Sequence, residues 1–369
     1  MPHKTQTHQV RSSLVLLLTA FIWGIAFVAQ RVGMEYIGPF LFAGLRFWLG
    51  ALTLGIVLLF RTWFAPASAA TTNPTASAAA APATSASTAT AASISTAPTA
   101  SASNSPAPNA PTSSTTPFTA TTSITPTSFS LMPIRKLIRA GVFCGFFLFA
   151  GGALQQVGLV YTSASKAGFL TALYIILVPV LGIITKHKTN WNTWIGVALA
   201  VAGLYFLSIT ENLTIQMGDV IVIIGAFFWA GHILTVDYFV GAINQREVLK
   251  LCIAQFVFAG TIAMLLAPLL DGFFVTQVFD LAALSAALIP ILYAGVLSTG
   301  VAFTLQAIGQ QGLPPAAAAI IMSLEAVFSV LGGVVLIHEV LSPRELVGCL
   351  LMFVAVILAQ LPLNRKAES

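Results

Sequence analysis

The amino-acid sequence predicts an all-α integral membrane protein whose ten transmembrane helices form two inverted repeats of five. The first observation behind this prediction is composition, because 57% of the residues are hydrophobic, only 7% are charged, and the mean hydropathy is +0.92. Soluble domains carry roughly a quarter charged residues. The lipid bilayer is therefore the expected solvent. The other two observations are a series of long apolar segments and an internal echo between the two halves.

The apolar segments have the length that a membrane span requires. A helix needs about 20 predominantly apolar residues to cross a hydrocarbon core of about 30 Å. Backbone polar groups in lipid must be satisfied within the segment, so these spans are expected to be helices. The ten expected spans are residues 12–31, 39–60, 138–159, 163–185, 191–209, 218–240, 247–269, 281–307, 314–337 and 344–362.

The first span is not expected to be a secretory signal. Ser12–Gln30 is longer than a usual signal core and has no A-x-A site before Arg31. It also resembles the internal segment around Trp229, which cannot be a signal.

Residues 65–130 differ from the rest because they consist almost entirely of Ala, Ser, Thr and Pro. Recurrent prolines break a helix, and the segment has too little bulky apolar surface to form a core. We expect a disordered, cytoplasmic low-complexity insert between the second and third spans. A functional tether and a glycosylated stalk are the alternatives.

Two short motifs recur in the same order in both halves. LQQVG at Leu154–Gly158 matches LQAIG at Leu305–Gly309, and AFIWG at Ala20–Gly24 matches AFFWA at Ala226–Ala230. In the first half, Trp23 and Leu154 lie 131 residues apart. In the second half, Trp229 and Leu305 lie 76 residues apart. The excess of 55 is close to the length of the insert. The sequence therefore predicts two repeats, residues 12–209 and 218–362.

Orientation follows from Lys and Arg near the span ends. With both termini in the cytoplasm, three basic residues face outward, namely Arg31, Lys166 and Arg344. The cytoplasmic side then holds Lys4, Arg11, Arg61, Arg135, Lys136, Arg139, Lys186, Lys188, Arg246, Lys250, Arg365 and Lys366. A bacterial plasma membrane protein of this orientation is expected. Five crossings invert the second repeat, an arrangement that permits alternating access at a midplane site.

Glu325 and Arg46 are ionisable residues in the middle of expected spans, where they cost several kcal/mol without a partner or a cavity. Glu325 is either a cavity-lining carboxylate that binds a cationic group or a proton, or a packing device that bonds a neighbouring helix. Arg46 stays charged, so it requires a carboxylate, carbonyls, water or an anionic substrate. A structural or snorkelling role is the alternative for Arg46, and Glu325 is a natural partner.

Other polar and aromatic residues are weaker candidates. Lys166 either meets an anionic substrate or is a solvated helix end, and His232 is either a hydrogen-bonded core residue or a proton relay. Trp229 shares a face with His232. Buried amides must be bonded, either to other helices or to substrate. The remaining candidates are the glutamines Gln155, Gln156 and Gln306 and the repeat-related Trp23.

Several classes of protein are excluded or disfavoured. The sequence contains no catalytic triad, HExxH motif or phosphate-binding loop, so we expect neither an enzyme nor an ATP-driven pump. No basic patch interleaved with aromatics indicates nucleic-acid binding. Cys144, Cys252 and Cys349 fall in apolar segments without CxxC spacing, so no disulfide, metal site or cofactor is predicted.

A wider pattern is carried by four segments, namely Thr19–Gly33, Pro39–Leu52, Gly225–Leu234 and Ala316–Ala359. Their order and spacing resemble the EamA-like, ten-helix members of the drug/metabolite transporter superfamily. The family usually has Glu-Pro where this chain has Glu325-Ala326. The resemblance implies a secondary transporter or facilitator that exports a small metabolite, either an amino-acid-like compound or another organic molecule.

The expected partners are a small-molecule substrate, the lipid bilayer and protons, and a homodimer is left open. The alternative function is a membrane-embedded scaffold or binding protein that acts through its cytoplasmic insert.

Overall fold

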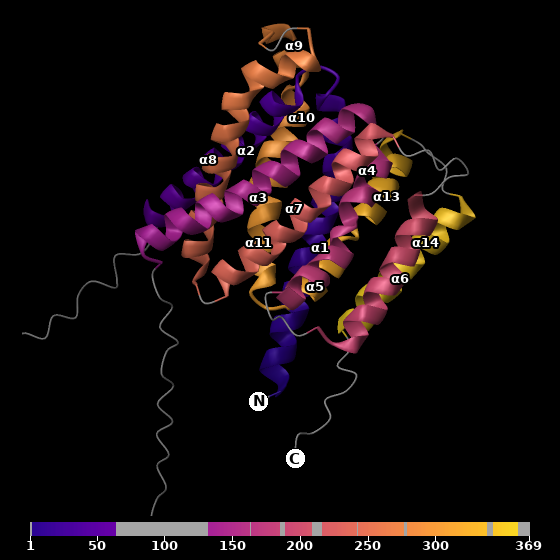
Figure 1. Cartoon of the computed structure of the whole chain (residues 1–369). Helices are drawn as coiled ribbons and strands as arrows, with labels where there is room; N and C mark the ends of the chain where they lie inside the picture. Colours follow the sequence, from indigo (N-terminus) through magenta and orange to yellow (C-terminus); the bar gives the residue numbers. More distant parts are fainter. Residues whose placement is uncertain are drawn as a thin grey trace, which may run out of the picture. The chain divides into compact units, whose positions relative to one another are not determined.

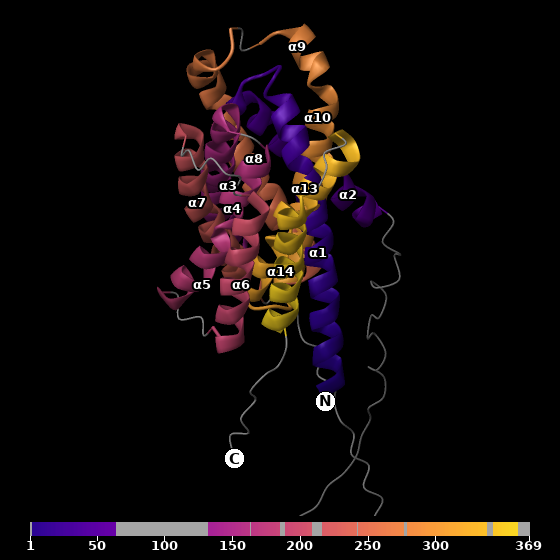
Figure 2. The ribbon, with the colours of Figure 1, turned by 90° about the vertical axis from the view of Figure 1, so that its right-hand side faces the viewer.

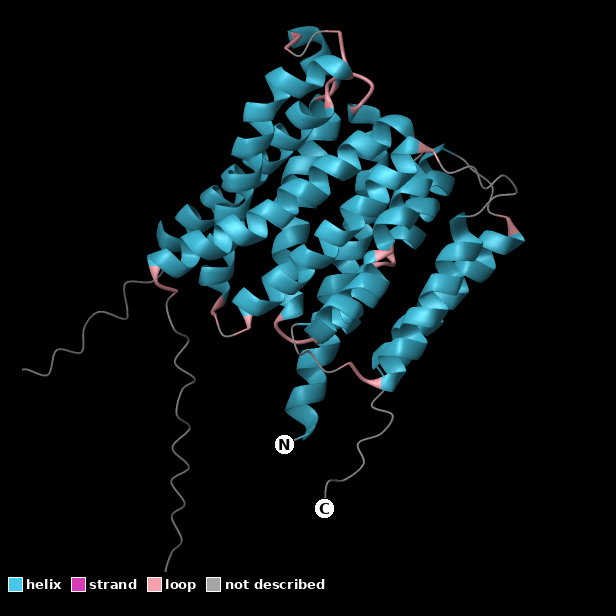
Figure 3. Ribbon diagram, viewed as in Figure 1, coloured by secondary structure: helices cyan, strands magenta, loops and turns pink. Residues whose placement is uncertain are grey.

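The computed structural model describes residues 2–63, 132–162, 164–184, 189–208, 216–241, 243–276, 279–337 and 342–360, and it contains helices and no strands within these ranges (Figure 3). The expected insert at residues 65–130 lies outside the described residues. The described elements are α1 (Pro2–Gly33), α2 (Pro39–Trp63), α3 (Ile134–Tyr161), α4 (Ala164–Ala172), α5 (Tyr174–Ile184), α6 (Trp191–Ser208), α7 (Met217–Val240), α8 (Gln245–Leu270), η1 (Asp271–Phe273), α9 (Leu281–Ala286), α10 (Leu288–Leu292), η2 (Tyr293–Ala302), α11 (Phe303–Gln310), α12 (Pro315–Met322), α13 (Glu325–Ile337) and α14 (Pro343–Gln360).

Among the described residues, 8 helical segments are long and apolar enough to cross a membrane. They are His8–Gly33, Pro39–Arg61, Ile134–Tyr161, Lys166–Ile184, Met217–Val240, Gln245–Phe273, Leu288–Gln310 and Pro315–Gly332. The two remaining expected spans correspond to the shorter apolar helix Trp191–Phe206 and to α14. The described part of the chain is therefore all-helical and has the apolar spans of an integral membrane protein.

The helices pack in pairs drawn from distant parts of the sequence (Figure 1). α3 packs along α7 and α8, α2 packs along α8 and η2, and α6 packs along α14. Two views place the start of α1 and the end of α14 at the same end of the bundle (Figures 1 and 2). Small residues permit these close contacts, as is usual between membrane helices. A Cβ atom added at Gly24 of α1, for example, would lie 2.5 Å from Phe328 Cβ and 2.7 Å from the carbonyl oxygen of Glu325.

Two expected spans are interrupted near their middles. The span at 163–185 breaks at Leu173 between α4 and α5, and the span at 314–337 breaks at Ser323–Leu324 between α12 and α13. The turn is tightened at both breaks, because Leu173 N–H donates to Leu170 O and Leu324 N–H donates to Ile321 O, three residues back. Pro179, inside α5, does not produce the first break, which lies six residues earlier.

The expected span at 281–307 is also irregular. It consists of α9, α10, the π-helix η2 and α11, and the membrane-length segment is Leu288–Gln310. Within η2 the Thr299 hydroxyl donates to Ala294 O, five residues back, at 2.8 Å. π-Helical turns redirect side chains and are frequent at functional sites.

Candidate functional site

The described helices enclose a small cavity where the two helix breaks meet. Its volume is about 40 Å³, which is room for one or a few water molecules. Nine elements contribute its lining, which consists of Trp23, Phe27, Gln30, Arg46, Gln155, Thr171, Tyr174, Trp229, Ile233, Ser298, Phe303, Gln306 and Glu325. The cavity is thus mainly apolar and aromatic, with a few polar groups of both charge signs.

Arg46 of α2 is fixed at one wall by the side chain of Gln30. Arg46 Nη1 donates to Gln30 Oε1 at 2.8 Å, and Gln155 Nε2 donates to the same oxygen at 3.2 Å. Gln30 Nε2 in turn donates to Ala26 O at 3.2 Å. This network joins α1, α2 and α3. It leaves Arg46 Nε and Nη2 buried and without a partner among the described residues.

Glu325 is the first residue of α13, directly after the break in its span. A carboxylate is favoured at a helix N-terminus, because it complements the helix dipole. The Tyr174 hydroxyl, at the first residue of α5, interacts with the Glu325 carboxyl. Tyr174 Oη, Thr171 Oγ1 and Glu325 Oε1 are all buried without a hydrogen bond of ordinary geometry. The two broken helices therefore place unsatisfied polar atoms at one point of the cavity.

An aromatic cluster forms another wall, with Phe303 in its centre. The Phe303 ring lies 4.8 Å from Trp23 and is stacked 5.9 Å from Trp229, centroid to centroid. Trp23 Nε1 donates to Ser298 O at 3.1 Å. Trp229 Nε1 is buried and has no partner among the described residues. The two repeat-related tryptophans are therefore not equivalent, since only Trp229 keeps an indole N–H available to a ligand.

The structure brings six of the nine expected site residues to the cavity and places three elsewhere. The six are Glu325, Arg46, Gln155, Gln306, Trp23 and Trp229. Gln156 is buried behind the wall, where its Nε2 donates to the Met34 sulfur at 3.4 Å. His232 also lies behind the lining, with its Nε2 2.9 Å from Gln255 Oε1. No ion pair joins Glu325 to Arg46, although both line the same cavity.

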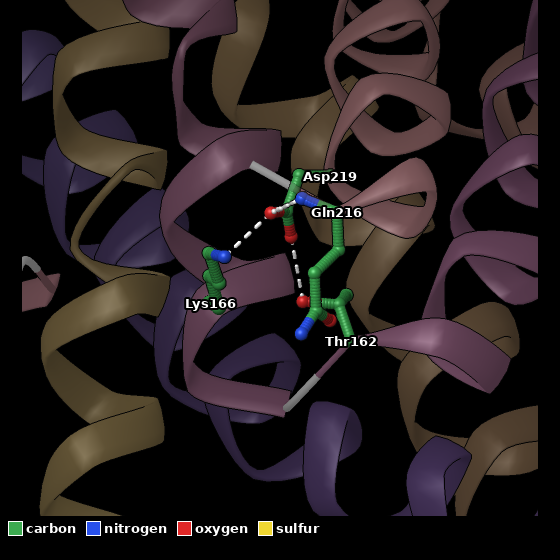
Figure 4. Close-up of polar contacts among 4 residues, drawn as sticks. All are labelled: Thr162, Lys166, Gln216 and Asp219. Carbon is green, nitrogen blue, oxygen red and sulfur yellow. Dashed lines mark hydrogen bonds and ion pairs between the residues drawn. The ribbon is translucent and has the colours of Figure 1, made fainter. Parts of the chain in front are cut away.

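Lys166 lies away from the cavity, where the chain enters α4 (Figure 4). Its ammonium bonds Asp219 Oδ2 at 2.5 Å, and the Thr162 hydroxyl donates to Asp219 Oδ1 at 2.8 Å. The Gln216 backbone N–H donates to Oδ2 at 2.8 Å. The Asp219 side chain is 2% exposed. This cluster of Thr162, Lys166, Gln216 and Asp219 fastens the start of α4 to the start of α7.

The sequence reasoning missed seven lining residues, of which three could have been found. Gln30 lies seven positions after Trp23 and therefore on the same helix face. Tyr174 lies 151 positions before Glu325, the same separation as Leu154 and Leu305 in the echoed motif. Thr171 lies three positions before Tyr174, so the two share a face in the expected span 163–185. No signal in the sequence indicated the π-helix that brings Ser298 to the wall.

A metal role has no support within the described ranges, where no group of three His, Cys, Asp or Glu side chains is close enough to hold an ion.

Comparison with known proteins adds the family. An uncharacterized transporter of Archaeoglobus fulgidus is 31% identical over 222 residues, covering 60% of this chain and 68% of the relative. The uncharacterized transporter YcxC of Bacillus subtilis is 21% identical over 233 residues, covering 58% of this chain and 70% of the relative. A crystal structure shares the fold, with a TM-score of 0.64 at 13% identity over 96% of this chain and 99% of the other. The sequence profile of the EamA-like transporter family matches residues 112–209 and 216–361. The chain therefore belongs to the EamA-like transporter family, within the drug/metabolite transporter superfamily.

Proposed function

We propose that this protein is a secondary transporter or facilitator that exports a small organic metabolite by alternating access. The observation that carries the proposal is the cavity at the two helix breaks, where Glu325, Tyr174 and Arg46 present unsatisfied polar atoms inside an otherwise apolar wall. A buried site of mixed polarity, flanked by half-helices, is the arrangement used by transporters with inverted repeats.

The positions of the helix ends support two repeats of five spans. α2 begins at Pro39 and α8 begins 206 positions later, at Gln245, which is also the separation of Trp23 from Trp229. After the insert the separation is 151: α4 and α12 begin at Ala164 and Pro315, and α5 and α13 begin at Tyr174 and Glu325. The two separations differ by 55, in agreement with one insertion in the first repeat.

Contacts at two glycines support the same relation. A Cβ atom added at Gly158 would meet the Val222 side chain and the Gly218 carbonyl. A Cβ atom added at Gly309 would meet the side chain of Leu16 and the carbonyl of Ser12. Each of these residues in α1 lies 206 positions before its counterpart in α7. The contacts between α3 and α7 are thus repeated between α11 and α1.

The proposed repeat relation places Tyr174 and Glu325 at equivalent positions, so their meeting point lies close to the axis that relates the two halves. A site on this axis is reached equally from either side of the membrane when one half rocks against the other. The cavity therefore occupies the place that alternating access requires.

The cluster around Asp219 supports a pathway whose two ends are closed by different contacts. The residue 151 positions after Lys166 is Ala317, and the residue 206 positions before Asp219 is Ser13. The ion pair therefore has no charged counterpart in the other repeat. We assign it to the external end, following the positive-inside orientation, and propose that it holds that end closed.

Purified protein in proteoliposomes tests the proposal. Efflux is measured for a panel of radiolabelled amino acids, organic acids, amines and sugars, with and without an imposed pH gradient. Flux of at least one solute above that of empty liposomes is expected. The absence of flux for every solute, from protein that is folded and correctly inserted, would contradict the proposed function.

A further inference from the structure

We infer that Arg46 is the acid-binding residue of the cavity, and that it holds the carboxylate of a transported organic acid or zwitterion. This inference rests on the proposed function and narrows its substrate class. Arg46 is 2% exposed and lines the cavity. Of its three nitrogens only Nη1 has a hydrogen-bond partner among the described residues.

A guanidinium in this position needs an anion, carbonyl groups or water, and the Phe47 ring, 4.8 Å from Arg46 Cζ, supplies a cation–π contact but no negative charge. Arginine cannot lose its proton in a protein, and a charge within the bilayer is costly unless it is paired. The described carboxylates that form ion pairs are Asp219 and Glu247, which bind Lys166 and Lys250. The Gln30 amide provides one neutral acceptor and no charge. Glu325, on the same lining, is not paired with Arg46 either, so Nε and Nη2 remain available to an anion in the cavity.

The free atoms of Arg46 are those that recognise a carboxylate. Nε and Nη2 lie on the same edge of the planar guanidinium, and this edge donates two parallel hydrogen bonds to the two oxygens of a carboxylate. Gln30 occupies Nη1 and so fixes the orientation of that edge. Gly152 of α3 lies beside it, where an added Cβ atom would be 3.0 Å from Nη2. The missing side chain keeps space next to the donors.

A singly charged acid suits the cavity better than a phosphate dianion. Arg46 is the only Lys or Arg among the lining residues, and Glu325 lies on the same lining. One positive charge balances one carboxylate, whereas a dianion would leave excess negative charge beside Glu325. The body of the solute would contact the rings of Trp23, Trp229 and Phe303. Because the cavity now holds about 40 Å³, it must widen to accept more than the acid group.

Binding to purified protein in detergent tests the inference with two matched pairs of probes. The first pair is 4-methylpentanoate and 4-methylpentanamide, and the second is leucine and leucinamide, which add an amino group. In each pair only the acid is replaced by a neutral amide. We expect the better-bound acid to bind the wild-type protein at least about tenfold more tightly than its amide, by isothermal titration calorimetry.

Three variants assign that preference to Arg46. Arg46→Gln should remove the preference for the acid, and Arg46→Lys, which keeps the charge but loses the two-donor edge, should reduce it at least about threefold. Arg31→Gln is the matched control, because Arg31 donates to Leu159 O at 3.1 Å and does not line the cavity. It should keep the wild-type preference. Size-exclusion profiles and thermal unfolding verify that each variant is folded.

The outcomes separate this inference from the proposed function. Equal binding of acid and amide by wild-type protein, no binding of any of the four probes, or an unchanged preference in folded Arg46→Gln would overturn the role of Arg46. If Arg46→Gln does not fold, the wild-type comparison and Arg46→Lys decide. Flux of a solute without an acid group would contradict the inference and leave transport intact. Acid binding without flux of any solute would contradict transport and leave Arg46 as an acid-binding residue.

Discussion

The lining of the cavity contains more hydrogen-bonding capacity than the surrounding helices satisfy. Arg46, Thr171, Tyr174, Trp229, Gln306 and Glu325 each have at least one buried donor or acceptor that makes no hydrogen bond of ordinary geometry with the described residues. A buried unsatisfied polar group costs roughly 1–3 kcal/mol, and more when it is charged. Several such groups around one cavity, rather than scattered through the bundle, favour a site that binds a polar solute or exchanges a proton.

The first prediction concerns Glu325. Glu325→Gln keeps the shape and hydrogen bonding of the side chain but removes its charge and its exchangeable proton. If Glu325 couples transport to protons, flux driven by a pH gradient should fall at least about tenfold, while the thermal unfolding temperature changes little. The measurement is pH-driven flux in proteoliposomes together with thermal unfolding of the same preparation.

The packing alternative for Glu325 gives the opposite pattern. In that case Glu325→Gln is nearly silent in flux, and Glu325→Leu lowers the unfolding temperature because it removes the bond between helices. Normal pH-driven flux by purified Glu325→Gln would exclude the coupling role and leave the structural one.

At the scale of residues, the sequence singled out side chains that the bilayer makes costly. Glu325 and Arg46 were identifiable because ionisable side chains within a span need a special environment, and both line the cavity. Lys166 was not identified as the partner of Asp219, because the two lie 53 positions apart and no local pattern joins them. Tyr174 looked like an ordinary aromatic residue until its position relative to Glu325 was considered.

At the scale of elements, the contact between α1 and α13 positions the helix break that carries Glu325. We expect Gly24→Ala to destabilise the protein by roughly 1–3 kcal/mol, because the added methyl group would overlap Phe328 Cβ and the Glu325 carbonyl. The same displacement should reduce flux. Thermal unfolding and proteoliposome flux measure the two effects.

Gly55→Ala is the matched control for this packing, since nothing lies within 4 Å of a Cβ atom added there. Alanine also favours the helix over glycine by up to about 1 kcal/mol. Gly55→Ala should therefore be neutral or slightly stabilising. Equal destabilisation by both changes would mean that the close approach at Gly24 is not what matters.

The cluster around Asp219 gives a second prediction for elements. Lys166→Met removes the ion pair between the starts of α4 and α7 and should open that end more often. A cysteine introduced by Thr171→Cys, which lines the cavity, should then react several-fold faster with a membrane-impermeant thiol reagent added outside. Stability should fall by roughly 1–3 kcal/mol, because Lys166 is 35% exposed but the Asp219 carboxylate that loses its partner is only 2% exposed.

Lys250→Met is the control for this experiment. Lys250 is similarly exposed, at 34%, and pairs with Glu247 three residues away on the same helix, so it joins no two elements. It should leave the labelling rate unchanged. Equal rates in Lys166→Met and the parent Thr171→Cys protein would remove the proposed role of the ion pair.

Hydrophobicity predicted the eight segments of membrane-spanning length, because burial in lipid depends on the number of consecutive apolar residues. It could not predict the breaks within them. Leu173 and Leu324 are ordinary helix formers in apolar surroundings, and the turns at these positions depend on packing between helices that lie far apart in sequence. The π-helix η2 was equally invisible, since its residues fit an α-helical span.

At the scale of the whole molecule, the match to the family does not include the first two helices. The family profile begins its first match at residue 112 and leaves α1 and α2 outside. These two helices nevertheless supply Trp23, Gln30 and Arg46 to the cavity. The low-complexity segment at residues 65–130 separates α1 and α2 from α3 in sequence, although both helices contact α3 in the structure.

The last prediction separates a transporter from a scaffold that acts through this insert. Residues 65–130 are replaced by a flexible linker of about ten residues that joins α2 to α3. All residues that line the cavity lie outside the deleted segment, so flux of the transported solute should remain within about twofold of the wild-type value. A scaffold that acts through the insert should instead lose capture of its protein partner and any activity that depends on it. Loss of flux from a shortened protein that still folds and inserts would show that the insert takes part in transport, contrary to the function proposed for the helical bundle alone.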